Sequence, residues 1–121
     1  MSSVKILDST LREGEQSLGI SFTKRQRLQL AWMLDYFGVD SIEISPVISD
    51  SHFESLKEMV RAGFSAQIIS HGRALPEDIE LARKCDAEWV AMYHSLRQRP
   101  AGERAARLST LHVRPGIARI A

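Results

Sequence analysis

Short apolar, β-branched runs alternate with amphipathic segments along the first 95 residues of the chain. The runs have the composition of strands and end in polar residues; they cover residues 4–10, 41–47, 66–71 and 88–95. The segments between them have the spacing of helices and cover residues 23–38, 51–64 and 76–85. Strands that are separated by helices pair in parallel, through right-handed crossovers. The alternation therefore predicts an α/β fold built on a parallel sheet.

Capping signals mark the ends of the first two predicted helices. Thr23 and Gln26 have the spacing of a capping box, and Gly38 is placed to end the same helix in a left-handed conformation. Ser51 and Glu54 repeat the capping-box spacing at the second helix. Within the first helix, the spacing of the apolar residues predicts a buried stripe formed by Leu30, Met33, Leu34 and Phe37.

Polar residues gather at the carboxyl ends of the four predicted strands, and this placement bears on the architecture. They are residues 8–16, 43–45, 71–73 and 94–95. A (β/α)8 barrel collects its active site from many strand ends at that face, whereas an open doubly wound sheet binds ligands at one switch point. No G-x-G-x-x-G or P-loop motif occurs in the sequence. We therefore predict half of a TIM (β/α)8 barrel, with about four strand–helix units.

The charge and the rhythm of the sequence change near Ser95. Residues 1–95 hold 10 Lys and Arg against 14 Asp and Glu, whereas residues 96–121 hold six Arg, no Lys and one Glu. The second segment also lacks the strand–helix alternation. We predict a partial barrel domain over residues 1–95 and an irregular, basic, Arg-rich tail over residues 96–121, either non-native in origin or disordered. The tail has no aromatic residue for stacking on bases, which disfavours nucleic-acid binding.

Composition and the N-terminal sequence bear on where in the cell the protein is expected. Hydrophobic and charged residues make up 44% and 26% of the chain, a balance typical of globular proteins. No stretch approaches the ~18 consecutive apolar residues of a membrane span, and residues 1–10 lack the pattern of a secretory signal. Cys85 is the single cysteine, so no internal disulfide can form. We therefore expect a cytoplasmic protein without a membrane partner, in which Cys85 is a packing residue.

Arg12 and Glu13 lie side by side just beyond the first predicted strand. A guanidinium can hold a carboxylate or stabilise a developing enolate, and a carboxylate can be a ligand of Mg²⁺, Mn²⁺ or Zn²⁺. A solvated surface ion pair is the simpler interpretation of the same two residues. Glu43, within an apolar strand, points either into a barrel mouth or to solvent. His71 ends the third strand as either a catalytic or a hydrogen-bonded structural residue.

Three segments of the sequence together resemble one family of enzymes. They are LDSTLREGEQ at residues 7–16, SIEISP at residues 41–46 and IISHGRA at residues 68–74. They resemble the homocitrate synthase and isopropylmalate synthase family, metal-dependent acyltransferases that share a barrel with the hydroxymethylglutaryl-CoA lyases. The resemblance spans roughly residues 4–95 and implies the N-terminal part of a TIM barrel. It also implies a place in amino-acid biosynthesis, such as lysine biosynthesis, and a homo-oligomeric full-length protein.

The resemblance implies a role for each candidate residue. Arg12 matches the catalytic arginine that polarises a 2-oxo acid and steadies the acetyl-CoA enolate. Glu13 matches a carboxylate ligand of a divalent metal ion, which is Mg, Mn or Zn. Gln16, Glu43 and His71 match substrate-binding residues, of which His71 reaches the far carboxylate of the oxo acid. The implied reaction is a Claisen-type condensation of acetyl-CoA with the 2-oxo acid, with the metal ion raising the electrophilicity of the acid.

The sequence departs from the family in its histidines. The family completes its metal site with a His-x-His pair, whereas the four histidines here are at positions 52, 71, 94 and 112. One carboxylate is a poor divalent site where three protein ligands are usual. We therefore expect an incomplete metal site and an inactive, truncated fragment of an acyltransferase. Two alternatives stay open: a carbon–carbon lyase of the hydroxymethylglutaryl-CoA lyase type, and a non-catalytic half-barrel that self-associates.

We expect the purified chain to release no CoA from acetyl-CoA in the presence of any 2-oxo acid, because the His-x-His pair is absent. The measurement is a thiol-detection assay with 2-oxo acids of several chain lengths. Turnover above background that disappears in the Arg12→Ala variant would contradict this expectation.

Overall fold

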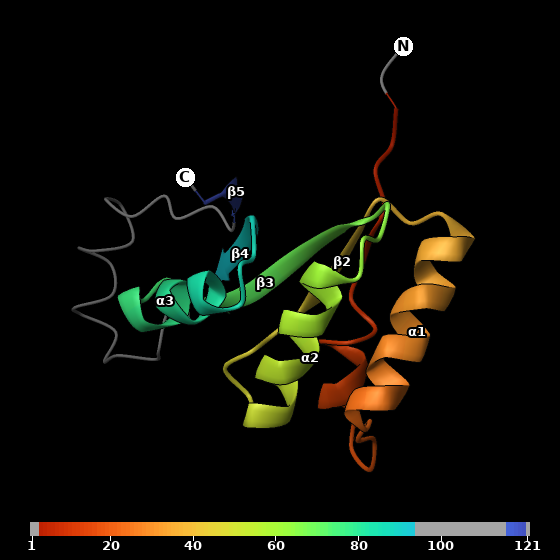
Figure 1. The fold of residues 1–121 in the computed structure, drawn as a ribbon, viewed down its shortest axis with the longest axis horizontal. Helices are drawn as coiled ribbons and strands as arrows, with labels where there is room; N and C mark the ends of the chain where they lie inside the picture. Colours follow the sequence, from red (N-terminus) through yellow and green to blue (C-terminus); the bar gives the residue numbers. More distant parts are fainter. Residues whose placement is uncertain (1–2, 94–115, 121) are drawn as a thin grey trace, which may run out of the picture.

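The computed structural model describes residues 3–93 and 116–120. Strands and helices alternate along the first of these ranges, as Figure 1 shows. The elements are β1 (Leu7–Asp8), the short 3₁₀ helix η1 (Gly14–Gln16), α1 (Lys24–Phe37), β2 (Ser41–Ile44), α2 (Asp50–Arg61), β3 (Gln67–Arg73), α3 (Pro76–Lys84), β4 (Trp89–Tyr93) and β5 (Gly116–Arg119). The predicted α/β alternation is confirmed, and each helix begins and ends within a few residues of its predicted bounds.

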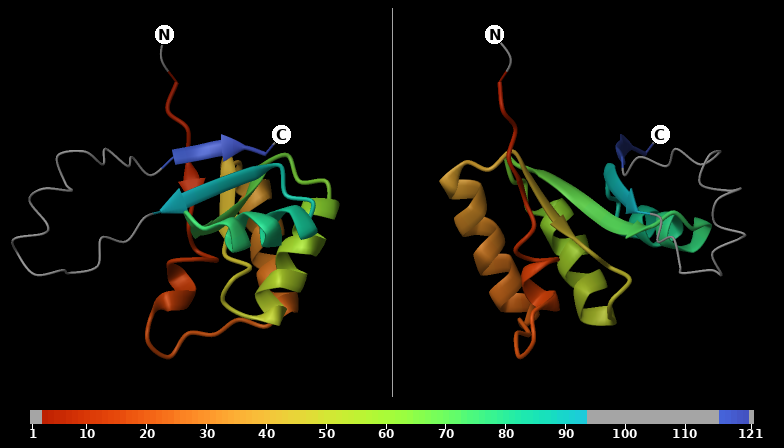
Figure 2. Two further views of the ribbon diagram at one scale, coloured as in Figure 1. Left: turned by 90° about the vertical axis from the view of Figure 1, so that its left-hand side faces the viewer. Right: turned by 180° about the vertical axis from the view of Figure 1, so that it is seen from behind.

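The five strands form one sheet in the order β1-β2-β3-β4-β5, which is also their order along the chain. The first four strands are parallel, so that Ile42 pairs with Ile68 and Ser70 pairs with Val90. Helices α1 and α2 lie side by side, and α3 lies at the other end of the sheet against β3 (Figures 1 and 2). A mostly parallel sheet whose neighbours are consecutive is consistent with part of a barrel. It brings the carboxyl ends of β1 to β4 to one edge.

Strand β5 corrects one expectation for the tail. Residues Gly116–Arg119 are not irregular: they pair antiparallel with β4, with Ala118 opposite Val90 (Figure 2, left). The outer edge of β4 is therefore paired, and β1 and β5 are the edges of the sheet in the described ranges. An edge strand offers a row of unpaired backbone donors and acceptors that any extended segment can satisfy. The domain boundary at residue 95 remains a prediction.

The predicted helix cap is present at α1, whereas α2 is capped by a different residue from the one predicted. The capping box of Thr23 and Gln26 is present in both directions, and Gly38 adopts a φ of 98° that favours glycine. At α2 the predicted cap, Ser51, is wrong. Ser49 caps the helix instead, with its hydroxyl accepting from the backbone N–H of His52. Ser51 accepts a hydrogen bond from a buried side chain of α1, which is described below.

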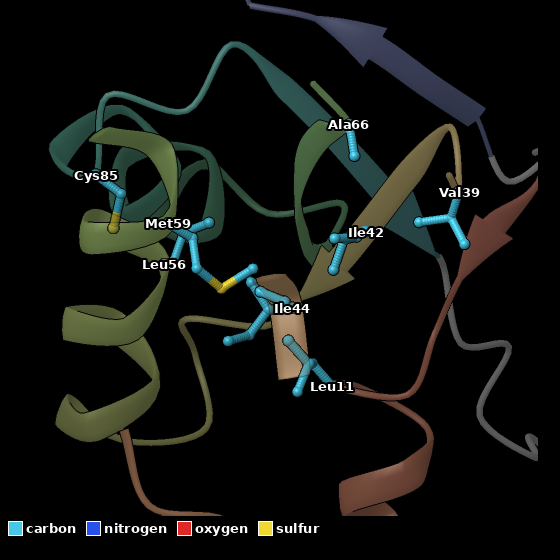
Figure 3. Packing of buried hydrophobic residues seen from close by; sticks show 9 residues of the cluster. Leu11, Val39, Ile42, Ile44, Leu56, Met59, Ala66 and Cys85 are labelled. Atoms are coloured by element: carbon cyan, nitrogen blue, oxygen red, sulfur yellow. The ribbon is translucent and has the colours of Figure 1, made fainter. Parts of the chain in front are cut away.

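A hydrophobic core lies between β2, α1 and α2 (Figure 3). Its fully buried members include Leu11, Ile42, Ile44, Leu56 and Met59. Burial of a large aliphatic side chain is worth about 1.5–3 kcal/mol, so this cluster supplies much of the driving force for folding. Cys85 also belongs to it, and burial raises the pKa of its thiol to about 11, as expected of a packing residue.

The buried face of α1 is rotated from the predicted stripe. Ala31 is fully buried and Leu30 and Leu34 are half-buried, but Met33 and Phe37 are 66% and 82% exposed. Arg27, one turn before Ala31 on the same helix, is also buried, at 2% exposed. Arg27 pairs with Glu15, and the spacing of apolar residues alone does not predict a buried charged residue on this helix. In the described part of the chain, no helix has the length and apolar character that a membrane crossing requires.

Candidate active site

The turn that follows β1 holds the first candidate residues. The carbonyl of Ser9 accepts hydrogen bonds from the backbone N–H groups of Arg12, Glu13 and Gly14, at 3.1, 2.8 and 3.3 Å. Leu11, within this turn, is fully buried in the core. Because Leu11 anchors the turn on the core side, its neighbour Arg12 is carried to the edge where the parallel strands end.

Arg12 is surrounded by groups from three parts of the chain. Its Nη1 lies 2.5 Å from Oε1 of Glu13 and 3.6 Å from Oε1 of Glu43, and its guanidinium lies 5.9 Å from the centre of the Tyr93 ring. The side chain is 19% exposed, whereas that of Glu13 is 59% exposed. Nε of Arg12 is buried and has no hydrogen-bond partner. A buried donor without an acceptor is costly, so this N–H is suited to an oxygen of a ligand or water.

Glu43 is the second carboxylate near Arg12. It lies on β2 with its side chain 7% exposed, and its Oε1 accepts a hydrogen bond of 2.6 Å from the Ser9 hydroxyl. Of the two orientations left open by the sequence, the structure adopts the one directed to the site. The buried Arg12–Glu43 contact also shows that Arg12 is more than one member of a surface ion pair.

His71 lies on β3, two strands from Arg12, and is 7% exposed. Its ring stacks on that of Tyr93 from β4, with ring centres 5.0 Å apart and planes at 17°. Burial lowers the pKa of His71 from its ordinary value, and the positive charge of Arg12 lowers it further, against smaller opposing effects of Glu43 and Glu13. These effects favour the neutral form of His71, which can donate one hydrogen bond and accept another.

We expect the pKa of the His71 imidazole to lie below 6.5, the ordinary value for histidine, and to lie closer to that value in the Arg12→Gln variant. The unfolded chain binds a proton at His71 before the folded chain does. The free energy of unfolding should therefore fall as the pH drops through 6.5, and His71→Gln should reduce that fall. The measurements are NMR titration of the ring protons and urea unfolding between pH 8 and pH 5.

The matched control is Arg25→Gln, which removes an exposed cation on α1. It should leave the His71 titration unchanged. A His71 midpoint that moves equally in both arginine variants would show that Arg12 has no specific effect on the ring.

A cavity of about 130 Å³ opens between the strand ends. It is lined by Arg12, Gln16, Ser45, Val47, Ile48, His71, Gly72, Arg73, Asp78 and Tyr93. The cavity thus brings together three of the five candidate residues, from the turn after β1 and from β3. Glu43 reaches the same place through its contact with Arg12. Glu13 contacts Arg12 without lining the cavity, and His94 lies outside the described residues.

Arg73, Asp78 and Tyr93 are cavity residues that the sequence analysis did not single out for the site. Arg73 donates from its backbone N–H, Nε and Nη2 to the Asp78 carboxylate, at 2.7, 3.0 and 2.9 Å. Hydrogen bonding to Arg73 lowers the pKa of Asp78. A Cβ on Gly72 would lie 3.0 Å from Cβ of Asp78, so glycine gives the carboxylate room to approach the strand. The sequence does contain a signal for this contact. Asp78 lies in the first turn of α3, and Arg73 precedes that helix by a few residues.

The family resemblance implies that Glu13 is one ligand of a divalent metal site that this sequence leaves incomplete. No group of three or more His, Cys, Asp or Glu side chains lies close enough to hold a metal ion in residues 3–93 and 116–120. The Glu13 carboxylate is engaged by Arg12, and the Glu43 carboxylate by Ser9 and Arg12. Glu13 and Glu43 supply two carboxylates, fewer than the three protein ligands that are usual at a catalytic divalent site. The assignment of Glu13 as a metal ligand stays a prediction.

Comparison with known proteins agrees with the resemblance of the motifs. A homocitrate synthase from Pyrococcus abyssi is 44% identical over 92 residues, which are 75% of this chain and 26% of that protein. An (R)-citramalate synthase from Methanocaldococcus jannaschii is 44% identical over 88 residues, and a probable 2-isopropylmalate synthase from Ignicoccus hospitalis is 42% identical over 91. These matches cover 72% and 74% of this chain but only 18% and 23% of those proteins.

Strands β1 to β4 and the residues that line the cavity all lie within residues 7–93 of the chain. The chain spans about a quarter or less of the length of these relatives. The family model called HMGL-like matches residues 3–99, which is most of the chain. This chain therefore belongs to the HMGL-like family.

Proposed function

We propose that the described residues form the 2-oxo acid-binding part of an acyltransferase active site that condenses acetyl-CoA with a 2-oxo acid. The observation that carries the proposal is the unpaired Nε–H of Arg12, buried beside a cavity that Arg12 itself lines. An arginine presents a planar fork of donors that fits the two oxygens of a carboxylate. The relatives are named as homocitrate, citramalate and isopropylmalate synthases, whose names point to this class of substrate.

Arg12 would bind the 2-oxo acid and stabilise negative charge that develops during the condensation. Its guanidinium is held from one side by Glu43 and by the ring of Tyr93, which orients it before a ligand arrives. Fixed donors of this kind need no rearrangement as charge develops, which is the basis of electrostatic catalysis. Glu43 would then act on substrate through Arg12 and not by direct contact.

His71 and Gln16 would contact the rest of the acid. Both line the cavity with Arg12, and the neutral imidazole of His71 can donate a hydrogen bond to a second carboxylate. This placement favours a longer dicarboxylate such as 2-oxoglutarate over 2-oxoisovalerate. In this proposal the chain corresponds to the N-terminal half of a (β/α)8 barrel, in the homo-oligomeric state implied by the family resemblance. The lyase and the self-associating half-barrel remain alternatives.

The test is a binding titration of the full chain with 2-oxoglutarate, 2-oxoisovalerate and pyruvate, followed by the NMR signal of the Arg12 Nε–H. We expect saturable shifts, with the highest affinity for 2-oxoglutarate. Glutarate, which lacks the oxo group, serves as the matched control ligand and should bind more weakly. Shifts that do not saturate, or that sodium acetate reproduces at equal ionic strength, would refute the proposal.

A further inference from the structure

A buried cluster of charged and polar side chains lies behind the turn that carries Arg12 and outside the cavity. Glu15 of η1, Arg27 of α1 and His52 of α2 form its centre, with side chains 5%, 3% and 7% exposed. None of the three lines the cavity. Their roles are therefore not explained by contact with a ligand there.

Glu15 connects three elements through its two carboxylate oxygens. Oε1 accepts from Nε of Arg27 at 2.6 Å, and Oε2 accepts from Nη2 of Arg27 at 3.3 Å. Nε2 of His52 lies 2.7 Å from the same Oε2. Because a carboxylate can only accept, this nitrogen carries a hydrogen that it donates to Glu15. One side chain thus joins η1 to the first turns of both α1 and α2.

The partners of Glu15 are held in turn by serines of α2 and its cap. Nη1 of Arg27 donates to the hydroxyls of Ser51 and Ser55, at 2.8 and 3.1 Å. Nδ1 of His52 lies 2.8 Å from the hydroxyl of Ser49. Each described nitrogen and oxygen in the cluster therefore has a partner, as a buried polar network requires to hold one geometry.

A buried ion pair is a weak source of stability, because the cost of removing both charges from water offsets most of their attraction. Apolar side chains of similar size would fill the space between η1, α1 and α2 as well. What they would not supply is direction: a bidentate arginine–carboxylate contact fixes distance and orientation together. The network is thus better suited to setting the position of the turn than to adding to the stability of the fold.

We propose that Glu15 is a positioning residue whose buried carboxylate locks the turn carrying Arg12 and Gln16 onto α1 and α2. The two residues immediately beside it in sequence are Gly14 and Gln16, and Arg12 lies one helical turn before it. The inference rests on the proposed function in so far as Arg12 and Gln16 bind the 2-oxo acid. The order of the turn itself can be measured without any ligand.

The experiment compares Glu15→Gln with Glu58→Gln in the full chain. Glu58 is a well-matched control, because its exposed ion pair with Lys24, at 2.5 Å, also links α2 to α1. Amide hydrogen exchange is measured without ligand for the turn amides of Arg12, Glu13 and Gln16, which donate to backbone carbonyls. Exchange in β2 and β3 reports on the rest of the fold. Affinity for 2-oxoglutarate is measured in parallel.

In Glu15→Gln we expect the turn amides to exchange about tenfold faster or more, while β2 and β3 change much less. Affinity for 2-oxoglutarate should fall by about tenfold, since Arg12 is no longer held in place. Glu58→Gln should change neither quantity. Turn amides that exchange at the wild-type rate, or that change only in step with β2 and β3, would overturn the proposal, since the network would then be purely structural.

Should Glu15→Gln fail to fold, His52→Gln provides the same test. It removes one tether to α2 and leaves the contact between Glu15 and Arg27 in place. A faster exchange confined to the turn supports the proposal, and unchanged turn exchange overturns it. If the wild-type chain binds no 2-oxo acid, the proposed function fails, and the exchange data still decide whether Glu15 orders the turn.

Discussion

Replacing Arg12 with alanine is expected to weaken the binding of 2-oxo acids strongly. The substitution removes the unpaired Nε–H and the cation beside the cavity, and it leaves the buried Glu43 without its charged neighbour. Truncating one partner of a buried, hydrogen-bonded charge pair costs about 2–5 kcal/mol. At 1.4 kcal/mol per factor of ten, the affinity should fall by roughly 30-fold to several thousandfold. The measurement is calorimetric titration with 2-oxoglutarate.

Two further variants separate charge from geometry at this position. Arg12→Lys keeps the cation but loses the planar fork, so its affinity should lie between those of the wild type and Arg12→Ala. Arg25→Ala removes an exposed arginine of α1 and should bind like the wild type. Equal weakening in Arg12→Ala and Arg25→Ala would mean that the acid senses only the net charge of the chain, and the assigned site would be wrong.

Replacing Leu11 with alanine is expected to destabilise the fold by about 2–5 kcal/mol. Leu11 is fully buried and packs in the cluster of Ile42, Ile44 and Leu56 (Figure 3), so alanine would leave a cavity there. A small domain has a free energy of unfolding of about 5–15 kcal/mol, of which this loss is a large fraction. The measurement is urea unfolding followed by circular dichroism.

The same chain offers a matched control for this substitution. Leu18 lies seven positions along the same loop and is fully exposed, at 104% of its reference area. Leu18→Ala should change the free energy of unfolding by no more than about 0.5 kcal/mol. Similar losses in the two variants would contradict the burial of Leu11 and, with it, the anchoring of the turn that carries Arg12.

The sequence predicted those parts of the fold that depend on contacts between residues only a few positions apart. Thr23 and Gln26 cap α1 through contacts within one turn, and Gly38 ends the helix because it tolerates a positive φ. The buried side of α1 was not predicted, because it depends on Arg27 meeting Glu15, a partner 12 residues away that spacing does not reveal. Strand β5 was missed for a similar reason, since a four-residue segment becomes a strand only by pairing with β4.

The residues of the candidate site likewise fall into those that the sequence predicted and those that depend on contacts between distant segments. Arg12 and Gln16 were proposed from the motif at residues 7–16, and His71 from the segment at residues 68–74. The parallel sheet brings all three to one cavity. Tyr93 was not predicted as a site residue. Its ring contacts with His71 and Arg12 form only when β3 and β4 are paired. The sequence did not predict the Glu15 cluster either, because its residues come from three separate elements.

The agreement between strand order in the sheet and strand order in the chain has a consequence for folding during synthesis. Each parallel pair joins strands that are consecutive in the chain and separated by one α-helix, as with Ile42 and Ile68 or Ile69 and Trp89. Loop closure costs entropy that rises slowly with length, and the chain is synthesised from its N-terminus. Because each of β2 to β4 pairs with the strand that precedes it in sequence, none of the parallel pairings needs a strand that is made later. The core partners of Leu11, in the turn that carries Arg12, also precede β5 in the chain.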